Sequence, residues 1–207
     1  MLVWLAFPAL ADPGDGFEPL REAADCVYTQ RPKEHAEGSA MRAVCTWADV
    51  DPAVLDEKLG DFAAYDEHIW VVDESEVRRT VGERSLVYQL QQIWGISDRE
   101  VLLWAWTEPV DGGHRHRWET ATDEPLEPRK GAIRTPKNEG YWEVRANPDG
   151  PGALVTHEIA VDAGGVPLPG WLLQWIRTRG FARVMDDIRS GSVIVPASPR
   201  DSAVPVR

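Results

Sequence analysis

Two histidines, His114 and His116, lie two residues apart in a strand-like segment, and that spacing places both imidazoles on one face of a β-strand. Imidazole is a common metal ligand, so this pair could begin a metal site. No third ligand is evident nearby, and the two cysteines, Cys26 and Cys45, cannot form a zinc site alone. We therefore expect no metal here and favour a solvated loop edge for both histidines.

His157 and Glu158 are the next ionisable residues with chemical potential. As neighbours in a predicted strand they point to opposite faces and cannot act as a pair. If His157 shares the inner face with Val155 and Ile159, its imidazole could hydrogen-bond the head group of a ligand. A hydrogen-bonded core histidine is the interpretation we favour.

Arg117 and Glu119 alternate with Trp118, which leaves two arrangements. Either the two charged side chains line a cavity, or Trp118 points inward and they face solvent, which is usual for an amphipathic strand. The sequence contains no Gly-x-Ser-x-Gly elbow, no phosphate-binding loop and no cysteine–histidine signature. It therefore indicates no cofactor and favours a protein that is not an enzyme.

Composition limits the classes of partner. The 207 residues fit one domain, and the net charge of −12 argues against nucleic acid and against strong non-specific docking on anionic lipid. A local basic patch could still bind such lipid. Ten tryptophans exceed what a core of this size needs. Such rings suit the wall of a hydrophobic pocket, although an aromatic core would give the same count.

The N-terminal residues 1–11 are apolar and end in Ala9-Leu10-Ala11, which resembles the cleavage region of a signal peptide without its basic start. We expect periplasmic or other export, with a cytoplasmic protein as the alternative. Cys26 and Cys45 lie in two strand-like segments joined by a polar loop. They could form a cross-strand disulfide in an oxidising compartment, or remain two buried thiols.

Most of the chain reads as antiparallel strands joined by glycine-rich turns. A short helix at Phe17–Ala24 precedes a hairpin of 26–30 and 41–47, and Asp51-Pro52 begins a second short helix. The predicted strands that follow are 69–73, 76–80, 85–93, 101–107, 114–122, 140–146 and 153–161. Leu102, Trp104 and Trp106 share one apolar face, which a C-terminal helix would cover.

That helix begins near Pro169 and runs to residue 190, and Gly180 could kink or split it. One side carries its apolar residues: Leu168, Trp171, Leu172, Trp175, Phe181, Met185 and Ile188. The predicted class is α+β, a helix-grip architecture in which a curved antiparallel sheet wraps a long C-terminal helix and leaves an internal hydrophobic cavity. We place a signal-like segment and linker at 1–16, the domain at 17–190 and a flexible tail at 191–207.

Three motifs, in order, carry a resemblance to a known family. They are Ile96-Ser-Asp-Arg99-Glu100-Val101; Pro128-Arg-Lys-Gly-Ala-Ile133-Arg134 followed by Gly140-Tyr141-Trp142; and Val161-Asp162-Ala-Gly164-Gly165 followed by Pro169-Gly-Trp171-Leu172. The chain resembles START (steroidogenic acute regulatory-related lipid transfer) domains of the helix-grip superfamily, as a bacterial member. The resemblance spans about residues 17–190.

The resemblance implies a monomeric protein that binds one lipid or sterol-like molecule in a tunnel, closed by the C-terminal helix, during transient membrane contact. The predicted ligand-binding residues are Trp94, Trp104, Trp106, Trp118, Arg134, Trp142, His157, Trp171, Trp175 and Phe181. One alternative is a cyclase or aromatase that uses Arg117, Glu119, Tyr141 or His157 as acid or base. Another is an interaction domain whose pocket is filled by its own tryptophans.

Overall fold

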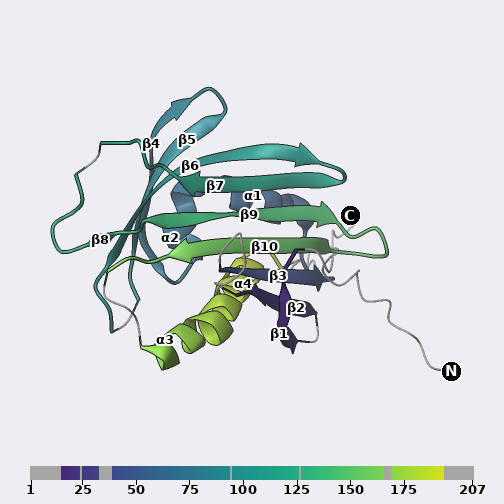
Figure 1. The fold of residues 1–207 in the computed structure, drawn as a ribbon. Coiled ribbons are helices and arrows are strands. Elements are labelled where there is room, and N and C mark those ends of the chain that lie inside the picture. The colour runs from purple at the N-terminus through teal and green to yellow at the C-terminus, as the bar shows by residue number, and fades with distance from the viewer. Residues whose placement is uncertain are drawn as a thin grey trace, which may run out of the picture.

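The computed structural model of the protein describes residues 15–23, 25–32, 39–93, 95–125, 127–165 and 169–193. It shows a large antiparallel sheet with a C-terminal helix along one face (Figure 1). The strands are β1 (Glu18–Ala23), β2 (Cys26–Arg31), β3 (Ala40–Trp47), β4 (Val72–Val81), β5 (Arg84–Gln91), β6 (Arg99–Val110), β7 (Gly113–Thr120), β8 (Ile133–Arg134), β9 (Lys137–Ala146) and β10 (Ala153–Asp162). The helical elements are α1 (Pro52–Gly60), the 3-10 turn η1 (Phe62–Ala64), α2 (Tyr65–His68), α3 (Gly170–Trp175), the π-helical η2 (Ile176–Gly180) and α4 (Phe181–Ser190).

The strand order is β1-β2-β3-β10-β9-β7-β6-β5-β4, and the short β8 pairs in parallel with β6. Strands that follow one another closely in sequence are neighbours, which confirms the expected antiparallel meander. Two details differ from the prediction. The two predicted strands 69–73 and 76–80 are replaced by one, β4, which begins at Val72, and Glu18–Ala23 forms β1 where a short helix over 17–24 was predicted. A segment of this length gains little as an isolated helix, whereas pairing with β2 satisfies its backbone hydrogen bonds.

The inner face of the sheet is the one that packs against α4. Val101 and Leu103 of β6 belong to the same buried cluster as Phe181 and Met185 of α4. Side chains alternate along a strand, so the residues between them, such as Leu102, point to the opposite, outer face. A second, smaller cluster forms there around Leu102.

Trp104 and Trp106 therefore lie on the outer face, and the expectation that the helix covers them is wrong. Both faces of β5 and β6 carry large apolar side chains, so alternation alone could not decide which face packs inward. Arginines cover the two rings instead: the Arg84 guanidinium lies 4.5 Å from the Trp106 ring centre and 5.8 Å from that of Trp104, and the Arg117 guanidinium lies 5.6 Å from that of Trp106. These cation–π contacts explain part of the tryptophan excess.

The C-terminal helix runs without a break from residue 170 to 190 (Figure 1). Gly180 has ordinary helical angles, φ −62° and ψ −47°. The irregularity is η2, where the Phe181 amide donates to the Ile176 carbonyl five residues back. This wider turn shifts the buried side of the helix, so α-helical spacing mispredicted Trp171, which is 66% exposed.

A disulfide joins Cys26 and Cys45, which face each other across β2 and β3. Of the two alternatives that the sequence left open, the structure thus has the cross-strand disulfide and not two free thiols. At the other end of the chain, Val193 bridges Val50, so the ordered structure extends slightly beyond the predicted boundary at residue 190. The signal-like residues 1–14 and the tail from residue 194 lie outside the described residues.

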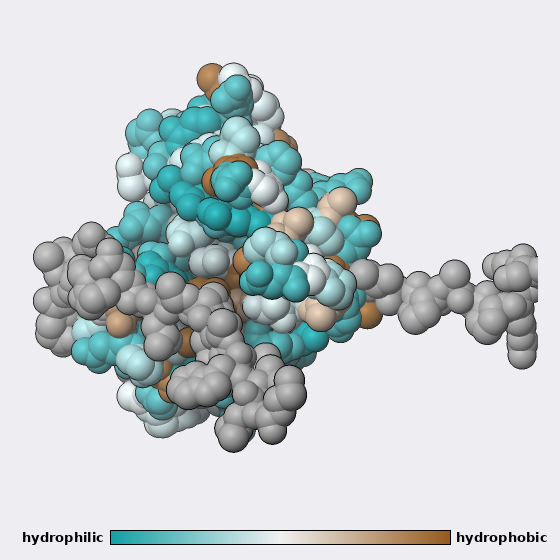
Figure 2. All heavy atoms as spheres, turned by 90° about the vertical axis from the view of Figure 1, so that its right-hand side faces the viewer, coloured by the Kyte–Doolittle hydropathy of each residue, from teal (hydrophilic) through white to brown (hydrophobic). Residues whose placement is uncertain are grey.

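Where coloured atoms are visible in Figure 2, hydrophilic residues dominate and hydrophobic residues reach the surface only in small areas. Within the described ranges, no helix is both long and apolar enough to span a bilayer.

Candidate functional site

Solvent exposure along the inner face rises towards one end of the strands. On β10, Val155 is 0% and His157 is 3% exposed, whereas Val161, on the same face, is 42% exposed. Ile159 lies between them and is half-buried, as is its partner Met41 on β3. The inner face is therefore completely covered at one end and only partly covered at the other.

The helix shows the matching gradient. Ile188 and Met185 of α4 are 0% and 1% exposed, whereas Trp175 and Ile176 are half-buried and Trp171 is largely exposed. Figure 1 shows α4 against the strands and α3 extending away from them. The exposure of the helix thus rises towards α3, where Leu172 alone is still buried among the described residues. We call the half-buried apolar residues at this place the apolar end: Met41, Ile159, Trp175 and Ile176.

Beside α4 the space between helix and sheet is filled by aromatic rings. His157 stacks on Trp142 with ring centres 3.6 Å apart, and Phe181 lies 5.3 Å from it on the other side. Trp118 adjoins this stack at 5.8 Å. His157 Nδ1 donates to the Tyr141 carbonyl at 3.0 Å, and burial lowers the pKa of His157 to about 3.

His157 is therefore a neutral, hydrogen-bonded core histidine, as predicted. Four predicted ligand-binding residues, Trp118, Trp142, His157 and Phe181, come together in this layer. As long as the helix stays in place, they form a packed core beside the apolar end.

Buried polar side chains adjoin the apolar end on the inner face. Asn138 of β9, 4% exposed, pairs with Val161 and accepts a 2.8 Å hydrogen bond from Trp118 Nε1. Thr135 is 2% exposed, and its hydroxyl has no partner within the described part of the chain. Because Arg134 points outward, alternation places the Thr135 side chain on the inner face. Sequence reasoning missed both residues, since small polar side chains carry no spacing signal.

The other predicted ligand-binding residues are dispersed. Trp104 and Trp106 lie on the outer face, as does Arg134, which pairs with the buried Glu100. Trp171 is at the exposed tip of α3, and Trp94 lies outside the described residues. Trp175 is at the apolar end, with its ring 5.9 Å from that of Trp70, which sequence reasoning did not single out.

The predicted acid–base residues do not converge. Trp118 points inward, so Arg117 and Glu119 occupy the outer face, the solvent-facing arrangement of the two considered. The Tyr141 hydroxyl, also outside, contacts Glu158 Oε2 at 3.3 Å, and burial raises the pKa of Tyr141 to about 12. His157 is on the other side of the sheet. These residues cannot act together on one substrate.

His114 and His116 share a face, as expected, but Asp56 of α1 joins them. Its two carboxylate oxygens lie 2.8 Å from His114 Nδ1 and 3.0 Å from His116 Nε2. His116 is 2% exposed, so the expected solvated loop edge is wrong for it, because α1 packs over this end of β7. Burial lowers the pKa of His116, an effect that Asp56 opposes. No group of three or more metal-ligating side chains occurs among the described residues.

No protein-family model and no curated protein matches this sequence. Solved structures do match. The STAR-related lipid transfer protein from Xanthomonas axonopodis has a TM-score of 0.69 at 23% identity, over 85% of this chain and 98% of that one. Human StAR-related lipid transfer protein 5 has a TM-score of 0.72 at 15% identity, over 86% and 87%. The chain has a START-like fold.

This START-like fold confirms the helix-grip architecture predicted from the sequence. It also occurs in the di-domain ARO/CYC protein BexL, which has a TM-score of 0.51 at 12% identity, over 76% of this chain and 50% of that one. The fold therefore hosts more than one kind of protein, and the function of this chain has to be argued from its own residues.

Proposed function

We propose that this protein binds one hydrophobic molecule, of the lipid or sterol class, at the apolar end between α3–η2 and the inner face of the sheet. The observation that carries this proposal is the parallel rise in exposure along β10, β3 and the helix. The apolar surfaces that face each other here stay accessible to water. A ligand that binds between them is stabilised by about 2.5 kcal/mol for each 100 Å² of its apolar surface that becomes buried.

Polar groups beside the apolar end provide an anchor for the ligand. The unpartnered hydroxyl of Thr135 is buried, which costs free energy unless a ligand completes its hydrogen bonding. A hydroxyl or ester oxygen on an otherwise apolar molecule supplies such a partner. This favours an amphiphile with one small polar group over a pure hydrocarbon.

The tip of α3 suits exchange of the ligand at a membrane. Trp171 and Leu173 are 66% and 39% exposed, and indole rings favour the interface between water and lipid. Transient insertion of this tip would bring the apolar end close to the bilayer. The role we propose is therefore lipid transfer or sensing, with the helix moving to admit the ligand.

Export to the periplasm or beyond is part of this proposal. The Cys26–Cys45 disulfide supports it, since structural disulfides persist in oxidising compartments. The signal-like start of the sequence agrees with the same location. The cyclase alternative receives less support, because its proposed acid–base groups lie on both sides of the sheet.

A pair of tryptophan variants tests the proposal. Trp175→Ala removes a ring of the apolar end, whereas Trp106→Ala removes an equal ring from the outer face. We expect Trp175→Ala to weaken binding of nitrobenzoxadiazole-labelled phosphatidylcholine or cholesterol about tenfold or more. Trp106→Ala should bind as the unmodified protein does.

Fluorescence titration measures both affinities, and circular dichroism checks that each variant folds. Native mass spectrometry of protein purified from its own host then identifies the molecule it carries. Equal binding by both variants would contradict the proposed site. Absence of binding of either probe, together with an empty protein in the mass spectrum, would contradict the function.

A further inference from the structure

A second candidate site lies on the other side of the C-terminal helix, where α4 faces the β1–β2 hairpin. It is a hollow of about 190 Å³ whose floor includes Cys26, Tyr28 and Trp47. Charged residues surround it, and we call it the arginine hollow; they are Arg21, Asp25, Arg179, Arg183, Asp186 and Arg189.

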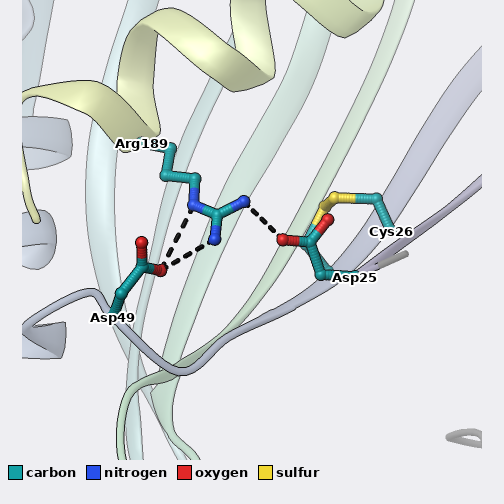
Figure 3. The surroundings of a disulfide bond; sticks show 5 residues. Asp25, Cys26, Asp49 and Arg189 are labelled. Atoms are coloured by element: carbon teal, nitrogen blue, oxygen red, sulfur yellow. Dashed lines mark hydrogen bonds and ion pairs between the residues drawn. A yellow bond between two sulfur atoms is a disulfide. The ribbon is translucent and has the colours of Figure 1, made fainter. Parts of the chain in front are cut away.

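One of its four arginines is neutralised within the protein. Arg189 Nη2 lies 2.8 Å from Asp49 Oδ1, and Nη1 pairs with Asp25 (Figure 3). These bonds fix Arg189 next to the disulfide and connect the end of α4 to the segments before β2 and after β3. Arg189 therefore has a structural role, and Asp25 is already engaged.

The other three arginines have no ion-pair partner among the described residues. The Arg21 guanidinium lies over the Tyr28 ring at 5.6 Å, and Arg183 lies over Trp70 at 4.9 Å. No contact to a carboxylate is formed by Arg21, Arg179 or Arg183 within the part of the chain that the structure describes. Asp186 is the one other acidic residue that lines the hollow.

This arrangement is unusual for so acidic a chain. Asp and Glu number 34 against 22 Lys and Arg, so carboxylates are in excess. Several other arginines do meet carboxylates, as Arg42 meets Glu158 and Arg115 meets Glu143. Three arginines without a carboxylate partner among the described residues line this one hollow, and together they make it a locally positive site that attracts an anion.

Size and chemistry together define that anion. A volume of about 190 Å³ corresponds to about six water molecules, enough for a phosphate group and too small for an acyl chain. Guanidinium groups bind phosphate oxygens through paired, charge-assisted hydrogen bonds. We propose that the arginine hollow is a binding site for a phosphate group, carried by an anionic lipid head group or by a soluble phosphate.

The site is distinct from the apolar end and does not rest on the hydrophobic-ligand proposal. The two are connected through the helix, since Arg21 Nη1 reaches the Thr178 carbonyl of η2 at 3.5 Å. A phosphate bound by Arg21 and Arg179, and by Arg183 once its guanidinium turns from the Trp70 ring, would link β1 to the helix at η2 and α4. If the phosphate belongs to a membrane lipid, the site orients α3 towards the same bilayer.

The test is a titration with inorganic phosphate, followed by nuclear magnetic resonance of the arginine Nε–Hε groups and nearby amides. The variant is Arg179→Gln with Arg183→Gln, two exposed positions whose change leaves the core intact. The control is Arg117→Gln on the outer face, where the guanidinium also lies near a tryptophan ring. We expect saturable binding that is about tenfold weaker in the double variant and unchanged in the control.

A second arm separates the two sources of phosphate by sedimentation with vesicles of phosphatidylglycerol or of phosphatidylcholine. Binding of phosphatidylglycerol vesicles that the double variant loses supports a lipid head group. Saturable binding of inorganic phosphate without vesicle binding supports a soluble ligand. No saturable binding of either, or equal weakening by Arg117→Gln, would overturn the proposal, and neither outcome concerns the affinity for hydrophobic probes.

Discussion

Reducing the Cys26–Cys45 disulfide should lower the free energy of unfolding by about 3 kcal/mol. The bond closes a loop with a sequence separation of 19 residues. In the chain-entropy relation, a loop of this size restricts the unfolded chain by roughly 11 cal/mol/K, which gives about 3 kcal/mol at 25 °C. The magnitude thus follows from where the two cysteines stand in the chain.

The folded state should persist after reduction, because other interactions hold the same strands. β2 and β3 remain paired along their length, and Arg189 still connects Asp25 to Asp49 (Figure 3). Cys26 and Cys45 are 5% and 1% exposed, so the two thiols stay in the core without new cavities. The decrease in the free energy of unfolding should therefore arise from the greater conformational freedom of the unfolded chain without the disulfide.

Urea unfolding, followed by tryptophan fluorescence with and without a phosphine reductant, measures the change. For a slope of about 1–3 kcal/mol per M, the midpoint should fall by about 1–3 M. The double variant Cys26→Ala, Cys45→Ala is the control, and its midpoint should not respond to reductant. An unchanged midpoint in the reduced natural protein, or two reactive thiols in the unreduced denatured protein, would refute the reasoning.

Three further predictions concern buried and half-buried positions. The pKa of His157 is about 3 when folded and about 6.5 when unfolded, so the unfolded chain takes up this proton first as pH falls. The contribution of neutral His157 to the free energy of unfolding is complete above pH 6.5 and decreases by roughly 3–5 kcal/mol as the pH falls towards 3. His157→Phe keeps an aromatic ring and should flatten this pH dependence, which urea unfolding measures. A curve as steep as that of the unmodified protein would contradict the prediction. Gly140→Ala should destabilise by about 3 kcal/mol, since its Cβ would lie 2.2 Å from the Glu158 carbonyl oxygen. Gly180→Ala has 3.7 Å of space in a helix and should stabilise by roughly 0.5–1 kcal/mol; calorimetry that ranks the two variants the other way would disprove this account.

Local signals in the sequence determined the fold. Turn glycines such as Gly82 and Gly112, both with positive φ, mark the hairpins of the meander, and Asp51 caps α1 through its side chain as predicted. These features involve residues close in the chain, so the local pattern contains the whole interaction. The spacing of Cys26 and Cys45 around a polar loop allowed a cross-strand disulfide but left two free thiols open, and the structure decided between them.

Only the tertiary structure decided which surfaces meet. Leu102 and Leu103 are equally apolar neighbours, yet one lies outside and the other packs beneath α4. The covering of Trp106 by Arg84 and Arg117 depends on strand register, as does the isolation of Thr135.

The same holds for both proposed sites. The apolar end exists because α3 extends away from the strands (Figure 1), and the arginine hollow exists because Arg21 comes to lie beside Arg179 and Arg183, far away in sequence. Alternation and helical spacing state which residues share a face of one element. They do not state which face another element covers, because that depends on packing across the whole domain.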